Sequence, residues 1–81
     1  MKNATFNPLA ARELVEAVDF YDQARQGLGD EFLQEIERAI AFLDRYPEAA
    51  PKVGREVRRL VLPRFPYSLI YRHLGSGQTR I

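Results

Sequence analysis

Apolar side chains recur at helical spacing along the first part of the chain. These positions are Leu14, Ala17, Val18, Tyr21 and Ala24. Residues three or four apart lie on one stripe of a helix, which indicates a single buried face. Asn7 followed by Pro8 is typical of a helix start, because the asparagine side chain can cap the first turn and proline suits its first position. The pattern predicts an amphipathic helix from Pro8 to about Arg25.

A second helical repeat follows after a short linker. Its apolar positions are Phe32, Ile36, Ala39, Ile40 and Leu43. Gly27 and Gly29 supply the backbone freedom that ends the first helix, and Asp30 is expected to cap the second. Pro47 forbids its continuation. Because the linker is short, the two helices are predicted to form an antiparallel hairpin.

The remainder of the chain is rich in strand-forming residues. A loop is expected from Pro47 to Gly54, and strands from Glu56 to Leu62 and from Tyr67 to Leu74. Thr5 and Phe6 close a short extended segment near the start, and Gln78 to Ile81 opens a further strand. This order predicts an α+β fold, β-α-α-β-β with an incomplete further strand. A two-helix hairpin then packs on a small antiparallel sheet, in a single domain of residues 1–81.

Alternation in the predicted β-hairpin makes both of its faces apolar. Val57 and Val61 point to one side and Leu60 and Leu62 to the other. In the second strand, Tyr67, Leu69 and Tyr71 oppose Ile70 and Leu74. Two helices can cover only one face, so the other is expected to be a binding surface for a partner peptide. Alternatively, residues beyond Ile81 or a second copy of the chain could cover this apolar face.

The charges are unevenly distributed. Residues 1–51 carry 5 basic and 10 acidic side chains and residues 52–81 carry 7 and 1, so the two parts bear −5 and +6. Such separation is typical of a surface that meets an acidic partner, either nucleic acid or a protein segment. The alternative is an acidic helical layer that merely covers a basic sheet.

Composition excludes several classes of site. The chain has no cysteine and one histidine, His73, so disulfides, thiolate metal sites and a zinc site of its own residues are excluded, and no cofactor or metal is expected. No segment has the apolar length of a signal peptide or a membrane span. We therefore expect a cytoplasmic protein.

The candidate chemistry lies among the basic and aromatic residues of the second part. They are Arg55, Arg58, Arg59, Arg64, Arg72, Arg80, Tyr67, Tyr71 and His73. Arginine holds phosphates or carboxylates through a planar fork, and tyrosine stacks on bases, so the set suits RNA contact.

Each of these residues also has a structural alternative to a functional role. Arg58 and Arg59 must face opposite sides, and one is expected at the sheet edge or paired with Glu35 or Glu37. Both tyrosines favour the core, and His73 has no evident orienting partner.

The order of several short segments resembles the RelE/ParE toxin family, in its ParE-like or plasmid-stabilisation branch. The matching segments are Ala11-Arg12-Glu13-Leu14, Tyr21, Gly27-Leu28-Gly29-Asp30-Glu31-Phe32, Tyr46-Pro47, Val57-Arg58-Arg59 and Arg64-Phe65-Pro66-Tyr67-Ser68-Leu69-Ile70-Tyr71. The resemblance implies a type II toxin, without a cofactor, that is held inactive by a cognate antitoxin wrapping over it. For that contact we expect Leu60, Leu62, Tyr67 and Leu69.

The resemblance leaves two targets open. ParE-like members are associated with inhibition of DNA gyrase by binding, and Arg58, Arg59, Arg64 and Arg72 are then the expected target contacts. RelE-like members are enzymes that cut messenger RNA on the ribosome, and Arg64 and Tyr71 would be the catalytic candidates. Ser68 stands where RelE-like sequences commonly have arginine, which favours the ParE-like alternative.

Relatives also continue past the position of Ile81 through a full basic strand, so two alternatives stay open: a truncated or disarmed form that lacks this strand, or a natural short form. A third alternative for the function is a non-toxic interaction module that uses the open sheet face only for assembly.

Overall fold

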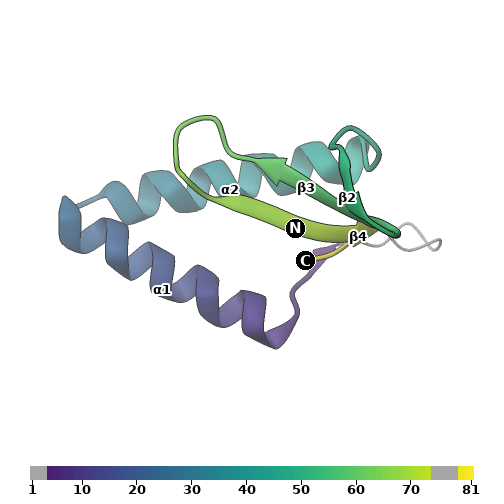
Figure 1. Ribbon diagram of the computed structural model, residues 1–81. Coiled ribbons are helices and arrows are strands. Elements are labelled where there is room, and N and C mark those ends of the chain that lie inside the picture. Colours follow the sequence, from purple (N-terminus) through teal and green to yellow (C-terminus); the bar gives the residue numbers. More distant parts are fainter. Residues whose placement is uncertain (1–3, 74–78) are drawn as a thin grey trace.

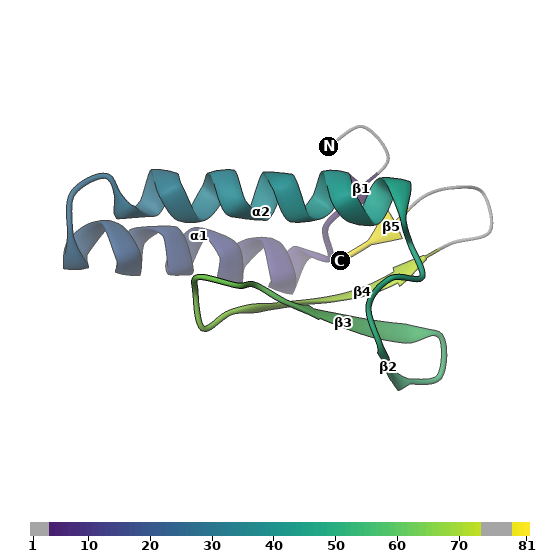
Figure 2. The ribbon, with the colours of Figure 1, turned by 90° about the horizontal axis from the view of Figure 1, so that it is seen from above.

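The computed structural model describes residues 4–73 and 79–81 and consists of a helical hairpin packed on a sheet (Figures 1 and 2). The elements are β1 (Ala4–Thr5), α1 (Pro8–Ala24), α2 (Leu28–Arg45), β2 (Lys52–Gly54), β3 (Val57–Val61), β4 (Ser68–His73) and β5 (Thr79–Arg80). The five strands lie in the order β1-β5-β4-β3-β2, antiparallel except for β1, which runs parallel to β5. The predicted α+β class and the helical hairpin are confirmed. The predicted positions of Leu74 and Gln78 lie outside the described residues.

Helix α1 starts as its sequence predicts. The Asn7 side chain accepts a hydrogen bond from the Leu9 N–H at 2.8 Å, and Pro8 occupies the first helical position. The helix ends one residue before the predicted Arg25, whose N–H still bonds to the Tyr21 carbonyl. The asparagine and the proline together therefore determine where this helix begins.

Helix α2 begins earlier than predicted, so the expected cap at Asp30 is wrong. Gly27, at φ 88°, precedes the first helical residue, and Asp30 lies within the first turn. The Asp22 carboxylate, which belongs to α1, accepts hydrogen bonds from the Gly27 and Gly29 N–H groups at 3.1 and 3.2 Å. Since a neighbouring helix supplies the cap, α2 can start directly after the turn.

The helices approach closely at Gly29. A Cβ atom there would lie 2.7 Å from the Val18 carbonyl oxygen, so only glycine fits without a shift. An aromatic cluster then fills the space between the hairpin turn and the sheet. Phe32 has its ring centroid 4.9 Å from that of Tyr21, 5.1 Å from Phe65 and 5.0 Å from Tyr67. These contacts tie both helices to the β3–β4 connection.

The two helices contribute unequally to the core. Helix α2 buries Phe32, Ile36, Ile40 and Leu43 completely or almost completely, whereas α1 buries no residue fully. The α1 stripe of Leu14, Ala17, Val18 and Tyr21 packs against the core while half-buried. Helix α2 is therefore the main apolar cover of the sheet.

The sheet contains one strand that was not predicted. Residues 52–54, assigned to a loop, form the edge strand β2, with Lys52 opposite Arg58 and Gly54 opposite Val57. The predicted β-hairpin is confirmed with slightly shorter strands, and Leu60 lies opposite Leu69. The predicted extended segments at both ends are confirmed as β1 and β5, which pair with each other.

Candidate functional site

The helix-facing side of the sheet is filled by the core. Tyr71 is 1% exposed, and its hydroxyl donates a hydrogen bond to the Pro47 carbonyl at 2.8 Å. Burial raises the pKa of the Tyr71 hydroxyl. Tyr67 is half-buried against Phe32, and burial raises the pKa of its hydroxyl too. Tyr71 therefore lies in the core, as predicted, and Tyr67 packs against the core while part of its surface stays exposed.

Arg58 and Arg59 face opposite sides of the sheet, as predicted. The Arg58 guanidinium donates to the carbonyl oxygens of Glu48 and Ala50, at 3.1 and 2.7 Å, and so holds the loop that leads into β2. Arg59 is exposed on the other face, where its Nε lies 3.1 Å from the Ser68 hydroxyl oxygen. Within residues 4–73 and 79–81, neither arginine pairs with the acidic residues of α2. Arg58 therefore supports the fold, and Arg59 remains accessible.

The acidic partner on α2 belongs to Arg64 instead. Arg64 Nε lies 2.8 Å from Glu35 Oε2, and the Arg64 backbone N–H donates to Oε1 at 3.2 Å. The hydrogen bond from the guanidinium lowers the pKa of the buried Glu35 carboxyl. This pair attaches the β3–β4 connection to α2, so its first role is structural. The Arg64 side chain is still 57% exposed and keeps donors for a partner.

The outward side of the sheet combines apolar and basic residues. Val61 and Ile70 are 60% and 48% exposed, so within the described residues the second face of the β-hairpin carries uncovered apolar side chains. The strand register places Arg59 opposite Ile70, and Arg72 opposite Arg80. We call this surface, made of Arg59, Val61, Ile70, Arg72 and Arg80, the basic sheet face.

Arg72 and Arg80 are the residues that distinguish the basic sheet face. Both are exposed, and they are directly opposite each other on β4 and β5. Like charges at opposite positions destabilise a sheet. No acidic side chain within the described ranges forms a salt bridge with either arginine. The pair therefore offers two guanidinium groups to an acidic ligand.

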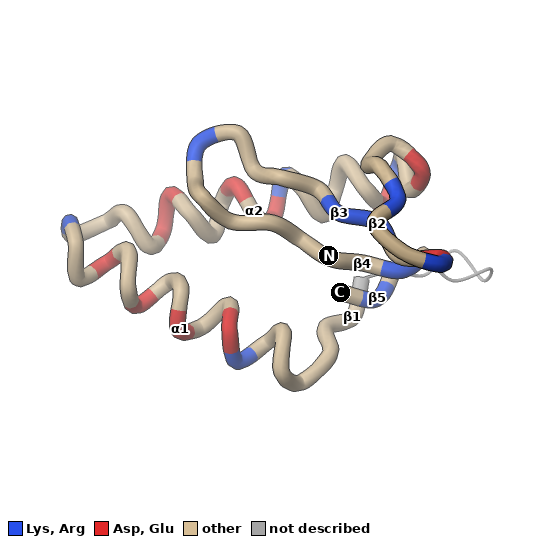
Figure 3. The backbone as a smooth tube through the Cα atoms, in the orientation of Figure 1, with Lys and Arg blue, Asp and Glu red and all other residues tan. Residues whose placement is uncertain are grey.

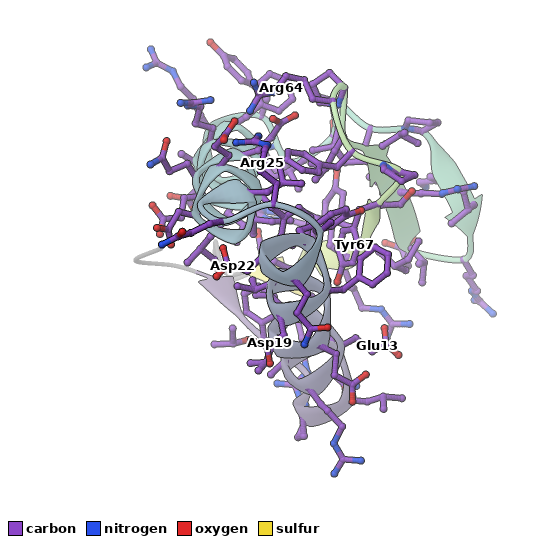
Figure 4. The ribbon with its side chains drawn as sticks, turned by 90° about the vertical axis from the view of Figure 1, so that its left-hand side faces the viewer. Glu13, Asp19, Asp22, Arg25, Arg64 and Tyr67 are labelled. Atoms are coloured by element: carbon purple, nitrogen blue, oxygen red, sulfur yellow. The ribbon has the colours of Figure 1, made fainter. Side chains whose placement is uncertain are left out.

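The whole molecule shows the same separation of charge. Figure 3 shows most acidic residues along the two helices, and basic residues both on the helices and on the strands, where few acidic residues lie. Figure 4 shows Arg64 at the connection beside α2, and Glu13 and Asp19 on α1. An acidic partner would therefore be attracted to the sheet and repelled by the exposed side of α1.

A family model decides the classification. The model described as "ParE toxin of type II toxin-antitoxin system, parDE" matches residues 4–81. The chain belongs to the ParE toxin family. Searches of curated proteins and of solved structures found no match.

We also searched the described part of this ParE-family chain for metal sites, membrane-spanning helices and a histidine with a charged partner. No group of three or more metal-ligating side chains comes together there, and no helix is long and apolar enough to cross a membrane. His73 is half-buried, with its Nδ1 3.4 Å from the Thr79 hydroxyl oxygen. The histidine therefore faces a neutral partner.

The residues expected to contact an antitoxin divide between two environments. Leu62 and Leu69 are 3% and 2% exposed and lie in the core of this ParE-family fold. Leu60 and Tyr67 are half-buried and keep some exposed surface. Sequence reasoning had not singled out Val61, Ile70 and Arg80 as one surface. Their exposure follows from which face the helices cover, and the position of Arg80 follows from strand register.

Proposed function

We propose that this chain is a toxin that inhibits DNA gyrase by binding, and that a cognate antitoxin keeps it inactive. Membership of the ParE toxin family supports the toxin role. The proposed target places its action in the cytoplasm. No cofactor is needed, because binding alone would block the enzyme.

The paired arginines Arg72 and Arg80 carry the argument for the contact surface. They face each other on neighbouring strands, without a salt bridge to an acidic residue of the described chain. Exposed Ile70 lies directly opposite Arg59 and precedes Arg72 by two residues on the same face of β4, so apolar area adjoins the positive charge. Interfaces commonly combine a desolvated apolar centre with arginines that pair with acidic groups. An acidic surface of the gyrase complex is the matching partner.

Binding explains the arrangement better than catalysis. RNA cleavage would use Arg64 and Tyr71, the two candidates that the sequence offered. The Tyr71 hydroxyl is buried and bonded to Pro47, and Arg64 is bonded to Glu35. The Tyr71 hydroxyl is therefore not free to take or give a proton at an exposed site, and the Arg64 guanidinium, although exposed, stays protonated. The accessible groups are guanidiniums, which hold anions and stay protonated.

A supercoiling assay tests the proposal. The purified protein should inhibit supercoiling by gyrase, and the double variant Arg72→Glu/Arg80→Glu should need at least about tenfold more protein for the same inhibition. The matched control is Arg12→Glu/Arg45→Glu, which makes the same change of charge on the exposed sides of the helices. The control should inhibit like the wild type.

Two outcomes would replace the proposal. Intact supercoiling together with cleaved message in a translation reaction would establish the ribosome-dependent nuclease instead. Intact supercoiling and intact message would leave an interaction module. Equal inhibition by the wild type and the Arg72→Glu/Arg80→Glu variant would remove the basic sheet face from the contact.

A further inference from the structure

Three arginines of the basic sheet face keep most of their hydrogen-bond donors available. Arg59 directs its Nε to a neutral group, the Ser68 hydroxyl oxygen at 3.1 Å, and a guanidinium has further N–H donors besides Nε. Arg72 and Arg80 lie opposite each other, and in the described ranges no acidic side chain forms a salt bridge with either of them. A ligand therefore meets three exposed guanidinium groups on one side of the sheet.

The strand register determines how far apart these arginines lie. Arg59 is opposite Ile70 on the neighbouring strand, and Arg72 follows Ile70 by two residues. With strands about 4.8 Å apart and a rise of about 3.4 Å per residue, the backbone of Arg59 lies about 8 Å from that of Arg72 and about 12 Å from that of Arg80. Each strand of duplex DNA carries one phosphate per about 3.4 Å of helix axis. Several phosphates of one duplex can therefore meet the three guanidiniums at the same time.

The part of the chain that carries these arginines has little negative charge. Residues 52–81 contain 7 basic side chains and 1 acidic side chain. Arg55 is exposed in the turn before β3, and this turn lies at the end of the sheet that bears Arg72, because Arg58 pairs with Tyr71. Most acidic residues lie along the helices instead (Figure 3). A polyanion would therefore be attracted to the strands and would approach with the helices turned away from it.

The basic sheet face is hollowed where Arg72 and Arg80 meet. The hollow has a volume of about 440 Å³. Ile70, Arg72 and Arg80 line it from the sheet, and Leu9 and Glu13 line it from α1. Aliphatic side chains beside guanidinium groups suit a ridge in which anionic oxygens alternate with apolar carbon atoms. The sugar–phosphate backbone of a nucleic acid has this chemistry.

The placement of the charges favours nucleic acid over an acidic protein segment. Protein–protein interfaces are depleted of charged residues at their centre. Interfaces with DNA are more polar and much more positively charged. On the basic sheet face Arg59 and Arg72 both adjoin Ile70, so the charges lie at the centre of the surface and not only at its rim.

We propose that the basic sheet face binds the sugar–phosphate backbone of duplex DNA. Arg59, Arg72 and Arg80 hold neighbouring phosphates, and Ile70 packs against the deoxyribose between them. Phosphate contacts carry no sequence information, so the binding is non-specific, with a Kd on the order of 10⁻⁴–10⁻⁶ M at physiological salt. The link to gyrase rests on the proposed function, because this contact would hold the toxin on the DNA that the enzyme binds. The DNA contact itself does not depend on that function.

Fluorescence anisotropy of a labelled DNA duplex tests the contact in the absence of gyrase. The logarithm of the association constant should fall linearly with the logarithm of the salt concentration, with a slope of about −2.7, because each of the three neutralised phosphates contributes about −0.9. The variant Arg72→Gln/Arg80→Gln should retain one contact, so its slope should be about −0.9. Its affinity at about 100 mM salt should be at least about tenfold lower than that of the wild type.

Three controls separate this contact from unfolding and from general charge effects. Like charges at opposite positions destabilise a sheet, so Arg72→Gln/Arg80→Gln should unfold at the same temperature as the wild type or at a higher one. The matched variant Arg38→Gln/Arg45→Gln removes two exposed charges from α2, on the covered side of the sheet, and should keep the affinity within about twofold and the slope unchanged. Glu13→Gln removes the carboxylate that lines the hollow and should tighten binding about two- to threefold.

Three results would overturn the inference. They are no binding of the duplex at low salt, equal binding by the wild type and Arg72→Gln/Arg80→Gln, or tighter binding of a polyglutamate peptide than of a duplex of equal charge. The last result would assign the basic sheet face to an acidic protein segment. Supercoiling by gyrase is scored separately. A protein that binds DNA but leaves supercoiling intact keeps the DNA contact and loses the proposed function, whereas inhibited gyrase without DNA binding keeps the proposed function and loses the DNA contact.

Discussion

The two faces of the β3–β4 hairpin are built from similar residues but have opposite environments. On β4, Leu69 is 2% exposed, and the next residue, Ile70, is 48% exposed. At the end of β3, Val61 is 60% exposed, and the residue that follows the strand, Leu62, is buried. The helices cover one face, and no described element covers the other (Figure 2). The covered face stabilises the fold, and the open face retains apolar area for a partner.

The arginines divide in the same way. Arg58 on the covered face donates to two carbonyl oxygens, and Arg64 holds a buried carboxylate. Arg59, Arg72 and Arg80 on the open face are exposed. A count of basic residues therefore overstates the binding surface, because two of the candidate arginines already have structural partners.

The largest difference in stability is expected between variants at two adjacent residues of β4, Leu69 and Ile70. Leu69→Ala should lower the free energy of unfolding by about 2–5 kcal/mol, because it leaves a cavity under α2. Ile70→Ala should change it by no more than about 0.5 kcal/mol. Urea denaturation followed by circular dichroism measures both values. Similar losses for the two variants would contradict the assignment of the faces.

The next contrast is between Arg58 and Arg59. Arg58→Gln should cost about 1.5–3 kcal/mol, because two carbonyl groups lose a charged donor. Arg59→Gln should leave the free energy of unfolding within about 0.5 kcal/mol and weaken gyrase inhibition. The same denaturation series and the supercoiling assay check this pair. A stable Arg58→Gln variant with lost inhibition would place Arg58 in the contact surface.

Local periodicity accounts for what could be predicted of the fold. The apolar repeats of the two helices and the alternation in β3 and β4 are properties of neighbouring residues, so the sequence displays them directly. Strand β2 has only three residues, all exposed, and includes Gly54, so it carries no such pattern. Its pairing depends on Arg58, which anchors the preceding loop through tertiary contacts.

Longer-range contacts explain the misses at the site. The cap of α2 comes from Asp22 on the other helix, so the local candidate Asp30 was the wrong choice. Glu35 and Arg64 are 29 residues apart in sequence, and nothing local favours Arg64 over Arg58 as the partner. Arg72 and Arg80 become a pair only through the register of β4 and β5. The sequence identified Arg58, Arg64, Arg72 and Arg80 as candidates, but it could not distinguish those with structural partners from those that are free to bind a ligand.

A smaller effect is expected when the Tyr71 hydroxyl is removed. Tyr71→Phe should lower the free energy of unfolding by about 1 kcal/mol, since the Pro47 carbonyl loses its hydrogen bond. The control Tyr46→Phe removes a hydroxyl from a tyrosine that is 52% exposed and should have almost no effect. Gyrase inhibition should survive in both variants. Loss of message cleavage in Tyr71→Phe would instead reveal a catalytic tyrosine.

The smallest effect is expected at the Glu35–Arg64 pair, because water screens the largely exposed arginine. Arg64 lowers the pKa of Glu35 below its usual value of 4.5, so the unfolded state binds more protons near that pH. The stabilisation of the folded state by the Glu35–Arg64 pair is therefore fully present above about pH 4.5. It is lost as the pH falls through the lower pKa that Glu35 has in the folded state. Glu35→Gln should remove this acid-dependent part, and the matched variant Glu37→Gln, at an exposed position, should keep it. The free energy of unfolding, measured from pH 3 to pH 7, provides the test. If it changes with pH in the same way for the wild type and for Glu35→Gln, the ion pair contributes nothing to the attachment of the β3–β4 connection.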